Sequence, residues 1–448
     1  MGRENRGRPA KVVSHGRYVT FQMAEVAVSR LMFRVHYHHD ANGNLVALTP
    51  PGGSAHRFAY TPVNLRSAYT PPTLPGTGGT TYSYDADRDA VTVARPDGTT
   101  VNGGYDSAGR LASLTTPTTT IDYTSSASTG NQVAASVTGG EALAYGYIGS
   151  LPTSSSWTGA VAGDVNVAYD DNFWVTSQTV NNVHQIDFAH DNDGLLVQAG
   201  SLVLASDPEN GLITTTTLGG TSDTRTYNGF GELKSYTANY GTTPLYTVKF
   251  ARDGVGRITT KTESIGGRTT AFAYSYDLNG RLTAISQNGV GIASYTYNAN
   301  SDRLTVTTAF GTATATYDAQ DRLLTDGSDL YSYTPNGELA SRTIGIKTRD
   351  FVYDDFGNLL AVKFPNGNVI EYIIDPEGRR VGKLVNAALA QEAAGPQPQT
   401  GPCDTWTYRR AAGRYRDCRG WRGLHDCEGP RVPLERARLS GRATNPSR

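Results

Sequence analysis

A histidine cluster is the clearest candidate for metal chemistry in this sequence. His36, His38 and His39 precede Asp40, and residues two apart on a strand project from the same face. Imidazole nitrogens are ligands for zinc, copper and iron, so His36 and His38 could form half of a metal site. The sequence offers no further ligands for it, and His39-Asp40 occupies a turn slot of the repeat described below. No metal or cofactor is therefore predicted.

Two pairs of adjacent carboxylates could act as general acids and bases or bind calcium. They are Asp170-Asp171 and Asp354-Asp355. Each pair falls on or beside a repeat turn, and no Asp-x-Asp-x-Asp-Gly loop accompanies either pair. The sequence also has no Gly-x-Ser-x-Gly nucleophile elbow and no phosphate-binding P-loop. No catalytic residue is predicted, and the chain is not expected to be an enzyme.

The C-terminal region differs in composition from the rest of the chain. Residues 386–448 hold 11 Arg and no Lys against 6 acidic residues, and they contain all three cysteines. Cys403, Cys418, Cys427 and His425 lack the Cys-x-x-Cys spacing of a zinc site. Arg with Trp could contact nucleic acid, but no deaminase motif is present and such non-periodic segments favour disorder. A nuclease-type activity in this tail is the weakest alternative, and no nucleic-acid partner is expected.

The amino-acid composition limits the classes of function and fold that the chain can have. The 448 residues include 40 Lys+Arg and 41 Asp+Glu, so the net charge of -1 does not favour binding to nucleic acid or to an anionic membrane surface. No apolar run is long enough for a membrane span, and the N-terminus does not resemble a signal peptide. The 50 glycines and the excess of 26 Tyr over 12 Phe favour strands and turns. The composition therefore predicts an all-β protein.

A repeated Tyr-Asp-x-x-Gly motif is the strongest signal in the sequence. Its opening residues between 276 and 374 are spaced by 16 to 21 residues. Weaker copies begin at His39, His190, Tyr227, Tyr297, Tyr333 and Ile374. The best copies are Tyr105-Asp106-x-x-Gly109, Tyr276-Asp277-x-x-Gly280, Tyr317-Asp318-x-x-Asp321 and Tyr353-Asp354-x-x-Gly357.

The motif has a direct physical interpretation. Alternating aromatic residues before it predict a strand, and Asp-x-x-Gly fits a type I turn in which the Asp carboxylate accepts a turn amide. Gly280 and Gly357 are expected to have positive φ, which Asp321 can also adopt. Asn288-Gly289 and Asn366-Gly367 predict a second turn halfway through the period. One repeat is thus one antiparallel hairpin, and successive hairpins must pair into a continuous sheet.

This pattern resembles the RHS/YD repeats of bacterial polymorphic toxins, insecticidal toxin-complex C components and teneurins. The resemblance implies hairpins that form a spiral, partial YD-shell within a larger secreted or cell-surface protein. It also implies a structural role, with the remainder of the shell or an encapsulated toxin domain as partner. The alternative is a cell-surface adhesion module that binds glycans or proteins through exposed aromatic faces.

The sequence predicts three regions. Residues 1–35 are unassigned and include a short helix near residues 23–32, residues 36–385 form the repeat array, and residues 386–448 form a disordered tail. Asp375-Pro376-Glu377-Gly378 superficially resembles a segment that closes the family's shells, but its flanks have the pattern of an ordinary repeat. The chain is therefore expected to be a truncated piece of a shell, with an unprotected edge strand at residues 369–374.

Overall fold

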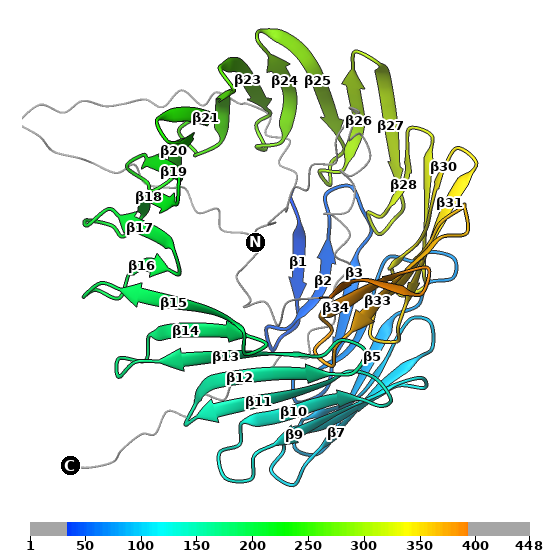
Figure 1. The fold of residues 1–448 in the computed structure, drawn as a ribbon. Helices are drawn as coiled ribbons and strands as arrows, with labels where there is room; N and C mark the ends of the chain where they lie inside the picture. The colour runs from blue at the N-terminus through cyan, green and yellow to red at the C-terminus, as the bar shows by residue number, and fades with distance from the viewer. Residues whose placement is uncertain (1–33, 393–448) are drawn as a thin grey trace, which may run out of the picture. The chain divides into compact units, whose positions relative to one another are not determined.

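The computed structural model describes residues 34–392, which contain 35 β-strands and no helix. Each strand pairs antiparallel with the strands that precede and follow it in the chain. The described strands belong to one compact unit that begins at Val35. The predicted fold class, an all-β array of hairpins forming a spiral, partial shell, is confirmed (Figure 1).

The strands are short throughout the described array. Those of its first part are β1 (His36–His39), β2 (Leu45–Thr49), β3 (His56–Tyr60), β4 (Arg66–Thr70), β5 (Thr80–Tyr84), β6 (Ala90–Ala94), β7 (Thr100–Tyr105), β8 (Leu111–Thr115), β9 (Thr120–Ser125), β10 (Gln132–Val137), β11 (Ala142–Ile148), β12 (Leu151–Thr158), β13 (Gly163–Tyr169), β14 (Val175–Val180), β15 (His184–His190), β16 (Leu196–Ala199), β17 (Leu202–Ser206) and β18 (Ile213–Leu218).

The second part continues with the same alternation of strand and turn. Its strands are β19 (Thr221–Tyr227), β20 (Leu233–Tyr240), β21 (Thr243–Arg252), β22 (Ile258–Ile265), β23 (Arg268–Tyr276), β24 (Leu282–Gln287), β25 (Val290–Tyr297), β26 (Arg303–Thr308), β27 (Gly311–Tyr317), β28 (Leu323–Asp326), β29 (Asp329–Tyr333), β30 (Leu339–Ile344), β31 (Lys347–Tyr353), β32 (Leu359–Lys363), β33 (Val369–Ile374), β34 (Arg380–Val385) and β35 (Ala388–Glu392).

The Asp-x-x-Gly segments form the expected turns. The backbone N–H of Gly280 donates to the carbonyl oxygen of Asp277 at 3.0 Å, which closes the turn between β23 and β24. The φ angles are +82° at Gly280 and +86° at Gly357, and Asp321 in the equivalent position has φ +58°. The predicted left-handed conformation is confirmed at all three residues. A side chain with a Cβ is strained in this region unless it is of the Asn or Asp type.

The two intervening Asn-Gly turns differ from each other. Asn288 and Gly289 both have positive φ, +50° and +82°, as a two-residue type I′ hairpin requires. In the Asn366-Gly367 turn only Gly367 has a positive φ, and its N–H donates to the carbonyl oxygen of Phe364 at 3.0 Å. Pro365 explains the difference, because its fixed φ favours the second position of a four-residue type I turn.

The sheet continues beyond its predicted end. We expected the strand at residues 369–374 to be the last, but β33 pairs with β34 and β34 pairs with β35. Asn386 and Ala387 both have positive φ, +50° and +64°, so they form the turn that joins the two added strands. The sequence signal was missed because Ala seldom adopts this conformation. The rest of the predicted tail and the predicted helix near residues 23–32 lie outside the described residues.

The sheet has two chemically different faces. Along β23 the side chains of Phe272, Tyr274 and Tyr276 are half-buried, whereas the alternating Ala273 and Ser275 are exposed. Full burial is confined to few places among the described residues. The largest buried cluster consists of Ala135, Leu143, Trp157, Val161, Val165 and Val381.

The turn geometry leads to a testable difference between two glycines. Gly280→Val should weaken the β23–β24 hairpin by about 1–2 kcal/mol, because a β-branched residue is strained at positive φ. Hydrogen exchange of the amides in β23 and β24 measures this loss directly. Gly254→Val is the matched control, since Gly254 lies in the equivalent type of turn, lacks the left-handed conformation and has open space around it, so that an added Cβ would meet no atom within 4 Å. Equal effects of the two substitutions would contradict the assigned role of Gly280.

Candidate functional site

The turn aspartate organises the start of the next strand. One carboxylate oxygen of Asp277, Oδ1, accepts the N–H groups of Asn279 and Arg281 at 2.9 Å each. The other oxygen, Oδ2, accepts Nε of the Arg281 side chain at 2.7 Å. The same Asp–Arg pairing, four residues apart, occurs at Asp106/Arg110, Asp253/Arg257, Asp318/Arg322 and Asp375/Arg379. The carboxylate is thus fully engaged in structure.

Some repeats reach the same geometry with different charges. In the turn after β25, Asn298 occupies the Asp position and its Nδ2 donates to Oδ2 of Asp302 at 2.8 Å. Asn228 donates in the same way to Oε2 of Glu232 at 2.7 Å. Where the two side chains pair, one therefore donates and the other accepts, and the two roles can be exchanged.

The motif tyrosine connects each repeat to the preceding one. The hydroxyl of Tyr276 donates to the carbonyl oxygen of Ile258, the first residue of β22, at 2.8 Å. The guanidinium of Arg257, from the preceding turn, lies 4.8 Å from the centre of the Tyr276 ring. The distance from the hydroxyl to the carbonyl is 2.7 to 3.0 Å for the tyrosines at 60, 84, 105, 147, 169, 227, 276, 297, 317 and 333.

The motif arginine spans two repeats. Besides its bond to Asp277, Arg281 donates from Nη1 to the carbonyl oxygen of Asn298 at 2.8 Å and lies 4.9 Å from the Tyr297 ring centre. A cation above an aromatic face is attracted by the ring quadrupole. Arg322 lies above Tyr333 in the same manner, at 4.8 Å. These contacts form a ladder along the sheet, from each turn to the next.

A second set of contacts joins parts of the chain that are far apart in sequence. We name the edge of the sheet that carries the Asp-x-x-Gly turns the motif edge, and the edge that carries the intervening turns the opposite edge. Turns 106–109 and 354–357 lie on the motif edge, and turns 95–98 and 116–119 lie on the opposite edge. In the described residues, the opposite edge of the first strands contacts the motif edge of the last strands, and we name this contact the seam.

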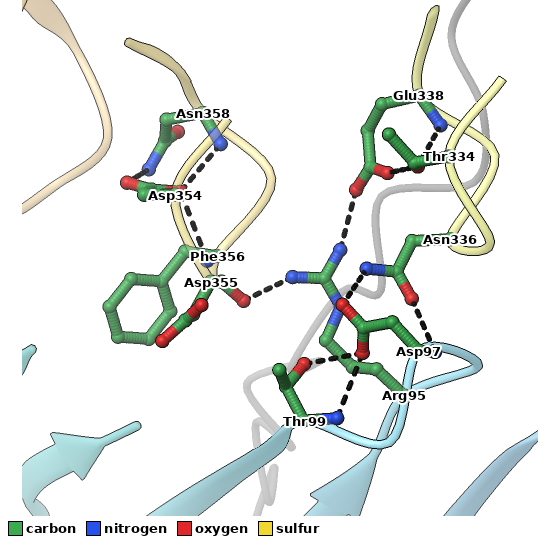
Figure 2. Close-up of polar contacts among 10 residues, drawn as sticks. All are labelled: Arg95, Asp97, Thr99, Thr334, Asn336, Glu338, Asp354, Asp355, Phe356 and Asn358. Atoms are coloured by element: carbon green, nitrogen blue, oxygen red, sulfur yellow. Dashed lines mark hydrogen bonds and ion pairs between the residues drawn. The ribbon is translucent and has the colours of Figure 1, made fainter. Parts of the chain in front are cut away.

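The best-connected part of the seam is centred on Arg95 (Figure 2). Nη2 of Arg95 donates to Oε1 of Glu338 at 2.5 Å, and Nη1 donates to the backbone carbonyl of Asp355. Beside this pair, the backbone N–H of Asp97 donates to Oδ1 of Asn336 at 3.1 Å, and Nδ2 of Asn336 donates to Oδ2 of Asp97 at 2.6 Å. The Arg95 and Glu338 side chains are only 13% and 17% exposed, so water screens their attraction weakly.

The seam continues on both sides of this cluster. Before it, the N–H of Gly52 donates to Oδ1 of Asn300 at 2.7 Å, and Nε2 of Gln320 donates to the carbonyl of Pro72 at 2.8 Å. After it, Thr118 donates its hydroxyl to Oδ2 of Asp355 at 2.6 Å. The Tyr145 hydroxyl then donates to Oε1 of Glu377, and burial together with this carboxylate raises the pKa of Tyr145. The buried cluster around Val161, which includes Val381 of β34, ends the seam.

The facing turns of the seam have a constant spacing when it is counted in strands, although Arg95 also reaches the adjacent motif-edge turn at Asp355. The turn after β2 contacts the turn after β25, the turn after β4 contacts the turn after β27, and the turn after β8 contacts the turn after β31. The partner is 23 strands away in each case, whereas the separation in residues falls from 248 to 237. Turns after odd-numbered and even-numbered strands alternate between the two edges. Because 23 is odd, a motif-edge turn therefore meets an opposite-edge turn. One coil of the spiral therefore contains 23 strands.

The predicted site residues are distributed along the sheet and do not converge. Each best copy of the motif lies at the end of its own strand, β7, β23, β27 or β31. Asp354 accepts the N–H of Phe356 at 3.0 Å within its turn, while its neighbour Asp355 belongs to the seam. His36, His38 and His39 are exposed on β1. No group of three metal-ligating side chains occurs in residues 34–392, and the Cys/His group of the tail lies outside them.

The seam residues are the functional positions that sequence reasoning missed. Asn300, Gln320, Asn336 and Glu377 all occupy the third position of a motif turn, and Asp355 occupies the second. These are the variable positions of Asp-x-x-Gly, so the repeat pattern gives them no weight. The arginine that follows the turn did carry a signal, because it recurs at 110, 257, 281, 322 and 379.

The Asp277/Arg281 pair should tolerate an exchange of donor and acceptor when both residues are substituted together. Arg281→Asp alone places two carboxylates together and should destabilise the hairpin, whereas Asp277→Asn with Arg281→Asp reproduces the natural Asn298/Asp302 pair. We expect the double variant to regain about 0.5–1 kcal/mol relative to Arg281→Asp, by a double-mutant cycle on unfolding free energies. Recovery should be incomplete, since the contacts of Arg281 with the next repeat are lost. Strict additivity would contradict the exchange of roles.

Acid should weaken the array through its turn carboxylates. Burial tends to raise the pKa of Asp277, but hydrogen bonds from Arg281 outweigh it and the pKa lies below the ordinary value; hydrogen bonds from Arg110 likewise lower the pKa of Asp106. A lowered folded-state pKa stabilises the fold above the unfolded value of about 3.9, and this contribution is lost as the pH falls through the folded value. The denaturant midpoint should be flat from pH 7 to about 5 and fall below about pH 4. A constant midpoint down to pH 2 would contradict this.

Known proteins share this architecture. The family model of the teneurin YD-shell matches residues 29–391. Teneurin-4 of Mus musculus is 28% identical over 254 residues, which are 53% of this chain and 9% of that protein. Teneurin-3 of Danio rerio is 25% identical over 369 residues, 77% of this chain and 13% of that protein. The chain thus spans only about a tenth of the length of these relatives.

Solved structures with the same fold include two complexes that contain TcdB2 and TccC3. The TcdB2–TccC3 structure aligns with a TM-score of 0.65 at 13% identity, over 78% of this chain and 22% of that chain. The TcdB2–TccC3–Cdc42 structure aligns with a TM-score of 0.63 at 14% identity, over the same shares of the two chains. At this identity the likeness concerns the fold alone. With the family match over residues 29–391, the hairpin ladder and the spiral sheet, the chain belongs to the teneurin YD-shell family.

Proposed function

We propose that this chain is a non-catalytic wall segment of a larger secreted or cell-surface protein that encloses or delivers a toxin domain. The observation that carries the proposal is the seam. Hydrogen bonds, an ion pair and a buried apolar cluster join one coil to the next from Gly52 to Val161. A sheet that is closed between coils in this way suits a wall that separates two compartments.

The similar TcdB2–TccC3 complexes support a wall role for the fold. The partners of this chain would then be the remainder of the shell and the enclosed domain. The residues around the motif support a role without catalysis, because Asp277 has both carboxylate oxygens occupied by turn donors. In the described range, no helix is long and apolar enough to cross a bilayer.

The adhesion alternative receives little support from the motif tyrosines. A glycan-binding face needs exposed rings on which sugars can stack. Tyr105, Tyr276 and Tyr317 are half-buried, and each hydroxyl is already bonded to a carbonyl of the preceding repeat. Their rings serve the internal ladder.

A protease-protection experiment tests enclosure. If the wall encloses the C-terminal region, trypsin should cleave the Arg-rich residues 393–448 of the full chain several-fold more slowly than it cleaves a synthetic peptide of that sequence. Arg95→Ala with Asn336→Ala opens the seam and should raise the cleavage rate in the full chain towards that of the peptide. Mass spectrometry of the released fragments gives both rates.

Arg57→Ala is the control for this experiment. Arg57 is exposed on β3 and makes none of the seam hydrogen bonds described above. Arg95 precedes Pro96, a bond that trypsin does not cleave, so Arg95→Ala removes no cleavage site, and the site that Arg57→Ala removes lies outside the measured residues 393–448. The cleavage rate of the control variant in residues 393–448 should equal that of the unaltered chain. Equal cleavage of the unaltered chain and the free peptide would show that this chain does not enclose its C-terminal region.

A further inference from the structure

The parts of both sheet edges that lie outside the seam form a second contact surface. On the motif edge, the turns before the seam carry apolar side chains at their variable positions: Phe230, Val255 and Leu278 are 92%, 77% and 100% exposed. Within the seam the same positions are polar, as at Asn300 and Gln320. Fully exposed large apolar side chains in series are unusual on a surface that faces only water.

The opposite edge shows the same change beyond the seam. Its turns in the seam are polar, as at Asp97 and Thr118. At its later turns, the flanking strand residues Ile265 and Val290 are 61% and 67% exposed, and the turn residue Ile346 is 99% exposed. Outside the seam, both edges therefore carry a group of exposed apolar side chains, although other turns outside the seam, such as the one with Asp193, are polar.

The seam supplies the geometry by which these two edges can meet. Within the chain, a motif edge already docks on an opposite edge, and one coil needs 23 strands. The 35 described strands exceed one coil of 23 strands. Among the described strands, the seam therefore leaves the motif edge of the earlier strands and the opposite edge of the later strands without a facing coil. The two edges are of opposite kind, as the seam requires, and the net charge of -1 gives little repulsion between copies.

We propose that a second copy of this chain docks on these edges head to tail, with the exposed apolar side chains of the motif edge of one copy against those of the opposite edge of the next. The contact is heterologous, because the two surfaces differ, so each bound copy presents a fresh edge to another. The contact between copies is apolar, whereas the seam within one copy is polar. Substitutions can therefore weaken association between copies without opening the seam. The inference goes beyond the proposed wall role and does not depend on an enclosed cargo.

Two edge-blocked variants test this arrangement by sedimentation velocity of the full chain. Phe230→Asp with Leu278→Asp blocks the motif edge, and Ile346→Asp blocks the opposite edge. Aspartate suits these motif turns, since Asp193 and Asp355 occupy the same variable positions elsewhere. The unaltered chain should form oligomers that grow with concentration, and each variant alone should associate at least tenfold more weakly.

The mixture of the two variants gives the decisive result. Each variant keeps one unblocked edge, so a 1:1 mixture should form dimers that grow no further. Ile186→Asp is the control, because Ile186 is 46% exposed and lies inside the seven-residue strand β15, outside the turns of both edges; it should assemble as the unaltered chain does.

Three results would overturn the inference. In the first, the unaltered chain stays monomeric at all concentrations. In the second, both edge variants form the same oligomers as the unaltered chain, which would indicate pairing through β35 instead. In the third, the 1:1 mixture of the two variants contains only monomers. Circular dichroism of each variant verifies that the sheet is retained. None of the substitutions touches the Arg95 cluster, so these outcomes are independent of the trypsin experiment.

Discussion

A β-hairpin in isolation buries too little apolar surface to be stable in water, and this constraint governs the whole sheet. The protein meets it by connecting every hairpin to the next through a fixed set of side chains. Arg281 illustrates the arrangement, because it binds the aspartate of its own turn and contacts the tyrosine and the backbone of the following turn. Since each such contact involves only neighbours, the array can be extended by adding repeats.

A single layer of sheet has a second requirement, since its edges expose turns along their whole length. The seam satisfies it for part of the chain by placing one coil on the next. Its chemistry differs from that of the ladder: the ladder repeats the same residues, whereas each seam contact uses its own pair, such as Arg95 with Glu338 or Tyr145 with Glu377. Neighbouring hairpins are therefore held together by the same contacts in many repeats, whereas neighbouring coils are held together by contacts that differ from one position to the next.

The sequence predicts the parts of the fold that are local. Asp-x-x-Gly, Asn288-Gly289 and the alternating tyrosines each determine their turn or strand within a few residues, and the structure agrees with them. The β34–β35 hairpin was missed because Asn386-Ala387 lacks the usual glycine. The seam could not be predicted, because its partners are more than 230 residues apart and occupy positions that the repeat leaves variable. The arginine was visible as a recurring residue, but its role across repeats depends on how neighbouring turns are spaced in three dimensions.

The constant count of 23 strands in each coil has a consequence for how such a chain can change in length. Additional residues in a loop alter the number of residues per coil, which already varies along the seam, and leave the facing turns in register. Duplication of one hairpin would preserve every turn, yet it would move all later contacts by two strands and place Arg95 opposite the wrong turn. Loops are therefore free to diverge, whereas the number of hairpins per coil is held fixed by the contacts between coils.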